Sequence, residues 1–154
     1  MQDQGTPTPR GAGVVLIPAQ AVDLLRDGLR SQIAIAAQHL IRAEEQLGAR
    51  EHPERYQEPL QCMDALRALL EEIGWSAPPS DRPVDLRTHG WALIEALQDQ
   101  VSVHTNMLGE LDRDDEQREA IMHNLSTLEP LALSVLLRTH AQMLRATTPQ
   151  SGSD

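Results

Sequence analysis

One long amphipathic stretch, Pro18 to Leu47, constrains the fold of this chain more than any other segment. At about 100° per residue, its main apolar residues fall within about 80° of arc, which is typical of a helix with one buried face. These residues are Val22, Leu25, Leu29, Ile33, Ala36, Leu40, Ala43 and Leu47. The segment therefore predicts a long helix that forms the spine of the fold.

The same helix has apolar residues outside this stripe. Leu24, Ile35 and Ile41 lie well off it, and the run Ile33 to Ala37 is apolar all round. A helix exposed to water on one side would not tolerate this pattern. We therefore expect neighbours on more than one side, either a second helix of the chain or its copy in a dimer.

Helical periodicity continues through the rest of the chain. A second helix is expected from about Pro53 to Gly74, and a third begins after Asp85, which is a suitable N-cap. A short helix then precedes a last helix that starts near Thr127, because Pro130 is best tolerated in a first turn. The last helix is expected to bury Leu133, Leu136, Leu137, His140 and Leu144. The predicted fold is all-α, an antiparallel four-helix bundle with one additional short helix.

The segments between and beyond the helices set the domain organisation. Residues 1–13 and 147–154 are polar and rich in small residues, which predicts disordered tails around a single domain at 14–146. Val14 to Ile17 is expected to lie extended over the bundle. Trp75 to Pro83 holds three prolines and is expected to be a stiff linker.

Composition supports the helical class and excludes several chemistries. Only 2% of residues are aromatic, whereas a sheet would be richer in aromatic and β-branched side chains. The chain has no Lys, which excludes lysine Schiff bases and a Walker lysine. A net charge of −10 with scattered Arg residues argues against a nucleic-acid partner. The Arg-, Ala- and Leu-rich composition suggests a bacterial source with a high-GC genome.

The expected setting is the cytoplasm. Cys62 is the only cysteine, so no intrachain disulfide is possible, and it is expected to be an inert thiol in an apolar environment. The first residues lack the basic and apolar regions of a secretory signal. We expect no membrane association, because Val14 to Ile17 is too short to span a bilayer.

Histidines offer the main candidate for a chemical site. No Glu-x-x-His pair or His-Glu-x-x-His motif occurs among the six histidines. His104 and His140 lie on predicted core stripes, with Gln100 one turn before His104 and Glu44 near the edge of the first helix's stripe. They either bind a metal or small ligand, or are core histidines satisfied by hydrogen bonds, and we favour the second interpretation. No cofactor and no catalytic residue is predicted.

Apolar residues off the core stripes give a second candidate, an interaction surface. Its members are Leu24, Ile35, Ile41, Trp91 and Ile94. Trp91 is either covered by the proline-rich linker or exposed as part of a partner surface, and we slightly favour the cover.

Two functional hypotheses follow. The first is a non-enzymatic helical-bundle module that acts by protein contact and forms a homodimer, or binds another protein, through the surplus apolar faces of the first and third helices. The second is a bundle that binds a small ligand or metal through inward-facing histidines. The absence of a catalytic constellation leans against an enzyme, while bundles in general serve many functions.

Overall fold

The computed structural model describes residues 13–47 and 54–147, and within them the chain is all-α apart from a two-stranded ribbon. The elements in order are β1 (Val14–Ile17), α2 (Ala19–Leu47), α3 (Glu54–Ile73), β2 (Arg82–Asp85), α4 (Leu86–Glu110) and α5 (Glu116–Thr147). The tails predicted at 1–13 and 147–154 fall almost wholly outside the described residues, as do Gly48 and Pro53.

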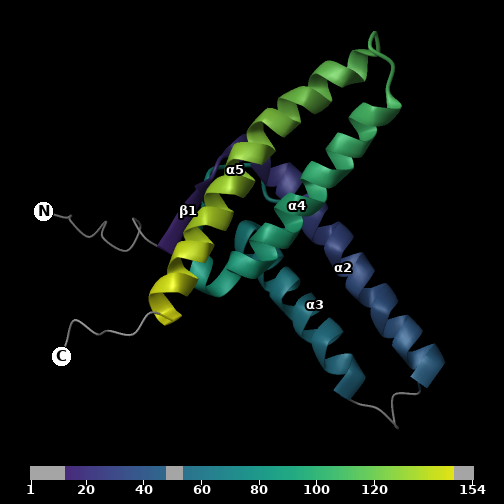
Figure 1. Cartoon of the computed structure of the whole chain (residues 1–154), viewed down its shortest axis with the longest axis vertical. Coiled ribbons are helices and arrows are strands. Elements are labelled where there is room, and N and C mark those ends of the chain that lie inside the picture. The colour runs from purple at the N-terminus through teal and green to yellow at the C-terminus, as the bar shows by residue number, and fades with distance from the viewer. Residues whose placement is uncertain (1–12, 48–53, 148–154) are drawn as a thin grey trace, which may run out of the picture.

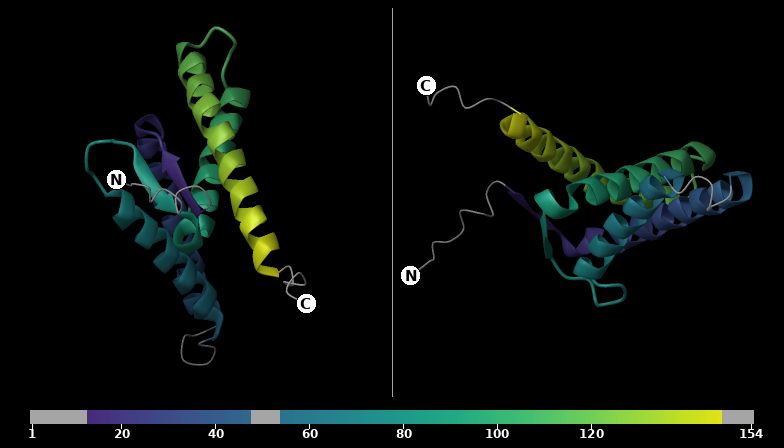
Figure 2. Two further views of the ribbon diagram at one scale, coloured as in Figure 1. Left: turned by 90° about the vertical axis from the view of Figure 1, so that its left-hand side faces the viewer. Right: turned by 90° about the horizontal axis from the view of Figure 1, so that it is seen from below.

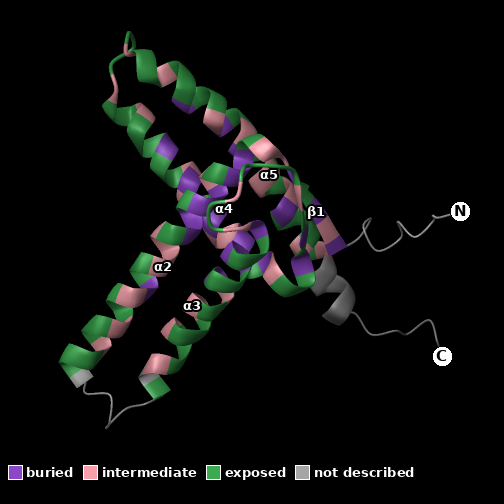
Figure 3. Cartoon of the chain, turned by 180° about the vertical axis from the view of Figure 1, so that it is seen from behind, coloured by how far each residue is buried: buried purple, intermediate pink, exposed green. Residues whose placement is uncertain are grey.

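The helices form two hairpins that cross near the middle of the molecule (Figure 1). One hairpin is α2 with α3, the other is α4 with α5, and α4 also packs on α2 and α3 where the hairpins meet. Buried residues gather at this crossing, and the far ends of both hairpins are mostly exposed (Figure 3). In both views of Figure 2 the yellow C-terminal half of α5 stands apart from α2 and α3. The predicted antiparallel four-helix bundle is therefore not confirmed.

The core contains aliphatic side chains from every element. Ile17, Leu25, Leu29, Leu70, Leu93, Leu97 and Leu128 are fully buried, together with others of the same kind. The first three helices match their predicted segments closely because each carries one strong apolar stripe. Asp85 caps α4 as expected, and its Oδ1 accepts a hydrogen bond from the Arg87 backbone N–H at 2.9 Å.

Arg26 is a buried charge that the apolar pattern of α2 does not reveal. Its guanidinium donates to the backbone oxygens of Gly74 at 2.7 Å and Ala77 at 2.6 Å, and pairs with Asp23 at 3.0 Å. It thereby satisfies carbonyl groups at the C-terminal end of α3, where a cation is favoured by the helix dipole. Gly74 ends this helix with φ 87°, as predicted for a glycine cap.

The extended segment at Val14–Ile17 is confirmed, and it is part of a ribbon that the sequence did not predict. β1 pairs antiparallel with β2, so the end of the expected linker is a strand, with Val15 opposite Val84 and Leu16 opposite Pro83. Val15 and Val84 are buried, while Leu16 faces solvent. Four residues at each strand are too few to show a clear period of two.

The expected short helix before the last helix is not present. Residues 116–147 form the single helix α5, with Pro130 inside it. Proline only disfavours a helix interior, and packing of Leu125, Leu128 and Val135 on both sides of it offsets that cost. Thr127 is thus not an N-cap; Asp115 is placed at the start of α5 and accepts from the Gln117 N–H at 2.8 Å.

The predicted core stripe of the last helix is also wrong in part. Leu133, Leu136, Leu137 and His140 are exposed, and Val135 is buried instead, while the side chain of Leu144 lies outside the described residues. This segment is apolar on two adjacent faces, and α4 covers only one of them. The pattern of apolar residues in a sequence does not show which of two apolar faces a neighbouring helix covers.

Candidate functional site

His104 is the one predicted site histidine that lies in the core. It is 8% exposed on α4, and its Nδ1 lies 2.8 Å from the Gln100 backbone oxygen. Its Nε2 lies 3.2 Å from Nδ2 of Asn124 on α5. A neutral imidazole that donates from Nδ1 and accepts at Nε2 satisfies both contacts. Both ring nitrogens therefore have protein partners, as in a structural core histidine.

Gln100 is buried one turn before His104, next to a polar cluster between α2 and α4. Asp99 accepts hydrogen bonds from Gln100 Nε2 at 3.2 Å, from Gln32 Nε2 at 3.0 Å and from Ser31 Oγ at 3.3 Å. The bonds from Gln32 and Ser31 link α2 to α4 at the crossing.

The other two members of the predicted buried polar site lie elsewhere. His140 is exposed on α5, roughly four turns beyond Asn124, the residue that contacts His104. Glu44 is exposed near the end of α2 and accepts a hydrogen bond from Tyr56 Oη at 2.9 Å. Desolvation and this bond raise the pKa of Tyr56. The structure thus brings together Gln100 and His104 but not His140 or Glu44.

Metal ligation has no other candidate in the part of the chain that the structure describes. Across residues 13–47 and 54–147, no group of three or more His, Cys, Asp or Glu side chains is placed to hold an ion.

The predicted interface residues divide into two groups. Leu24 and Ile94 pack against the hydrophobic core, which explains their apolar character without a partner. Ile35, Ile41 and Trp91 are exposed, Trp91 at 47%. The proline-rich linker therefore leaves much of Trp91 uncovered.

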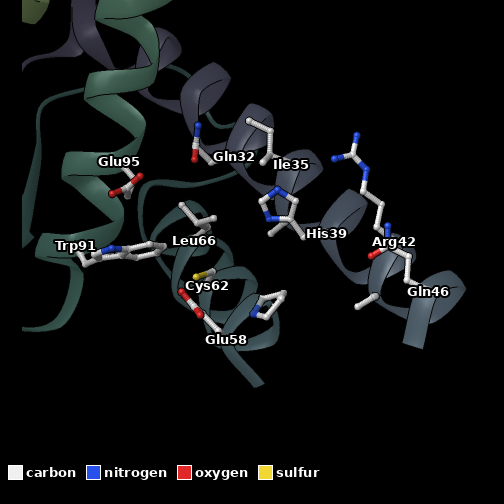
Figure 4. Close-up of a pocket in the computed structure, with 13 residues that line it drawn as sticks. Gln32, Ile35, His39, Arg42, Gln46, Glu58, Cys62, Leu66, Trp91 and Glu95 are labelled. Carbon is white, nitrogen blue, oxygen red and sulfur yellow. The ribbon is translucent and has the colours of Figure 1, made fainter. Parts of the chain in front are cut away.

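Ile35 and Trp91 border a groove of about 500 Å³ between α2, α3 and α4 (Figure 4). Its apolar walls come from Ile35, Ala36, Pro59 and Leu66, and its polar side chains include His39, Arg42, Glu58 and Glu95. Cys62 lies in the same groove, half-buried. Burial and the charges of Glu58 and Glu95 raise the pKa of the Cys62 thiol. The thiol therefore ionises less readily than that of a free cysteine, but it lines a groove with charged neighbours and not the apolar environment expected from the sequence.

A second surface, which we call the α5 face, consists of Leu133, Leu136 and Leu137. These side chains are 57%, 44% and 60% exposed. Leu133 and Leu136 border a shallow hollow of about 470 Å³ that is also lined by Val101 and Ser102 of α4. Sequence reasoning missed this face because it assigned the same residues to the core.

The apolar character of α5 has a further consequence. Glu116–Ala141 is long and apolar enough to cross a membrane by length and composition, and 22% of its most apolar window is buried inside the molecule. In this structure Leu125 and Leu128 of the segment pack toward α4, and Asn124 contacts His104.

Comparison of the chain with protein-family models, curated proteins and solved structures finds no match.

Proposed function

We propose that this protein is a non-enzymatic helical module that acts by protein–protein contact, and that its first partner is a second copy of itself, bound through the α5 face. The exposure of Leu133, Leu136 and Leu137 on a regular helix carries this proposal. Neighbouring leucines on one face of a long helix are normally covered by another apolar surface.

Charge favours a second copy as the occupant. The chain carries a net charge of −10, so most faces of two copies repel each other. Between Pro130 and Ala141, however, Arg138 is the only residue with a full charge, and its Nη1 donates to the Val14 backbone oxygen at 3.0 Å. Glu129 also lines the hollow beside Leu133 and Leu136, so the α5 face carries one acidic and one basic residue on a strongly acidic molecule, and self-association meets less repulsion there.

A dimer with two-fold symmetry would account for the way the two hairpins diverge from their crossing. In such a dimer the α5 face of each copy covers that of the other, an isologous contact. The α4–α5 hairpins of the two copies then complete an antiparallel four-helix bundle across the interface. In this proposal the bundle predicted for one chain forms between two.

The alternative function, binding of a metal or small ligand by inward-facing histidines, has less support. It needs His104 and His140 in one site. His104 of α4 lies beside Asn124 of α5, whereas His140 is exposed on α5 roughly four turns beyond Asn124.

Sedimentation equilibrium of the untagged protein, with and without single substitutions, tests the proposed dimer. Leu133→Glu and Leu137→Glu place a charge in the proposed interface, and each is expected to weaken self-association by roughly tenfold or more, as for central interface residues. Circular dichroism should show unchanged helix content, because both side chains are exposed in the single chain.

Ile41→Glu provides the matched control. It introduces the same charge at an exposed apolar residue of α2 and is expected to leave self-association unchanged. A wild-type protein that stays monomeric at high micromolar concentration would contradict the proposal. So would a dimer that is lost in Ile41→Glu and kept in Leu137→Glu.

A further inference from the structure

One end of the groove between α2, α3 and α4 combines an aromatic ring with two carboxylates. Trp91 and Glu95 lie one turn apart on α4, and Glu58 lies opposite them on α3. Figure 4 shows the indole of Trp91 extending into the groove, with the Glu95 carboxylate on one side of it and the Glu58 carboxylate on the other. A smaller hollow of about 200 Å³ joins Trp91, Glu58 and Cys62 at this end.

The negative charges of Glu58 and Glu95 both affect the part of the groove around Cys62. The negative charges of Glu58 and Glu95 each contribute to the raised pKa of Cys62, after the effect of burial. Within the described part of the chain, the salt bridges join Arg26 to Asp23 and Arg30 to Asp27, and neither Glu58 nor Glu95 takes part in one. Both carboxylates line the groove near Trp91, whereas Arg42, which lines the same groove, lies toward its other end (Figure 4).

We propose that this end of the groove binds an organic cation, an ammonium or guanidinium group carried on a short apolar chain. The face of a tryptophan ring attracts such a cation, and the two carboxylates pair with it. Ile35 and Leu66 supply an apolar wall for the attached chain. The groove has the volume of a small-molecule site.

The lining favours an organic cation over magnesium or calcium. Magnesium and calcium require several oxygen ligands around one point, whereas this end of the groove offers two carboxylates beside an indole and a neutral thiol. An alkylammonium group uses the ring and the aliphatic wall as well as the charges. The site lies on α2, α3 and α4 and is separate from the α5 face.

Fluorescence titration of Trp91 with pentylammonium tests this proposal. The titration uses a Trp75→Phe background, since the chain contains only these two tryptophans and the Trp75 side chain is exposed. Pentylammonium is expected to change the Trp91 emission saturably in the millimolar range. It should bind roughly tenfold more tightly than 1-pentanol, because the alcohol keeps the apolar contacts but lacks the charge, and pentanoate should not bind.

Substitutions that replace a carboxylate by a neutral amide of similar shape test where the cation binds. Glu58→Gln and Glu95→Gln are each expected to weaken pentylammonium binding about two- to fivefold, the range for partly exposed ion pairs. Glu72→Gln removes the same charge from an exposed position of α3 outside the groove and should have no effect. Bound pentylammonium should also slow the alkylation of Cys62 by iodoacetamide, which is unambiguous because the chain has one cysteine.

A guanidinium-bearing probe identifies the source of the cation. Arginine amide and a short arginine-containing peptide, compared in the same titration, show whether the group is accepted free or on a chain, and binding of either supports the site. Equal binding of pentylammonium and pentanol, no saturation by any cation, or a Glu58→Gln/Glu95→Gln double variant that binds like the parent would overturn the proposal.

Discussion

At the scale of single residues, the crossing of the two hairpins depends on a glycine. A Cβ atom at Gly28 on α2 would clash with the backbone carbonyl oxygen of Ala96 on α4. Backbone cannot move aside as a flexible side chain does, so the close approach of α2 and α4 requires a residue without a side chain. The sequence showed Gly28 only as one of several small residues on the helix.

Gly28→Ala is therefore expected to lower the free energy of unfolding by about 1–3 kcal/mol, the usual cost of overpacking. Gly109→Ala is the matched control, because a Cβ there meets no atom within 4 Å. Alanine is the better helix former, so this variant should be more stable than the parent by about 0.5 kcal/mol. Urea denaturation of both measures the difference; a stabilised Gly28→Ala would contradict the described contact.

At the scale of elements, the β1–β2 ribbon closes the core where the hairpins cross. Ile17, Val15 and Val84 are buried on one face of the ribbon, and Leu16 is exposed on the other. Arg138 of α5 also binds the Val14 carbonyl. The ribbon thus ties the start of the chain to the segment before α4 and to α5.

Val84→Thr is expected to lower the free energy of unfolding by about 1–3 kcal/mol, because it buries a hydroxyl in an apolar site at nearly constant volume. Leu16→Thr changes the exposed face of the same ribbon, and surface changes of this kind cost no more than about 0.5 kcal/mol. Thermal unfolding followed by circular dichroism compares the two variants. Equal effects would show that the ribbon does not have one buried face.

At the scale of the whole molecule, the net charge of −10 affects the two proposed contacts in opposite ways. Self-association through the α5 face brings two acidic molecules together, so salt should favour it by screening their repulsion. Cation binding near Trp91 depends on attraction to Glu58 and Glu95, so salt should weaken it.

Raising NaCl from 0.1 M to 1 M shortens the screening length from about 10 Å to about 3 Å. The dimer dissociation constant from sedimentation is expected to fall several-fold, and the pentylammonium dissociation constant from Trp91 fluorescence is expected to rise several-fold. Parallel changes of both constants would contradict at least one of the two proposals.

The sequence by itself determined the helical class and most helix positions. Each of α2, α3 and α4 carries one dominant apolar stripe and recognisable end signals, such as Asp85 and Gly74, and these are local properties of the chain. Their positions, and that of the extended segment at Val14–Ile17, could therefore be predicted. His104 could be predicted to lie inward for the same reason.

Only the tertiary structure decided which apolar faces are covered and which distant residues meet. It separated His104 from His140, paired β1 with β2, continued α5 through Pro130 and left Leu133, Leu136 and Leu137 exposed. It also placed Trp91 of α4 beside Glu58 of α3. The physical reason is that periodicity records the faces a helix prefers to bury, whereas coverage depends on how many neighbours the crossing angle brings within reach.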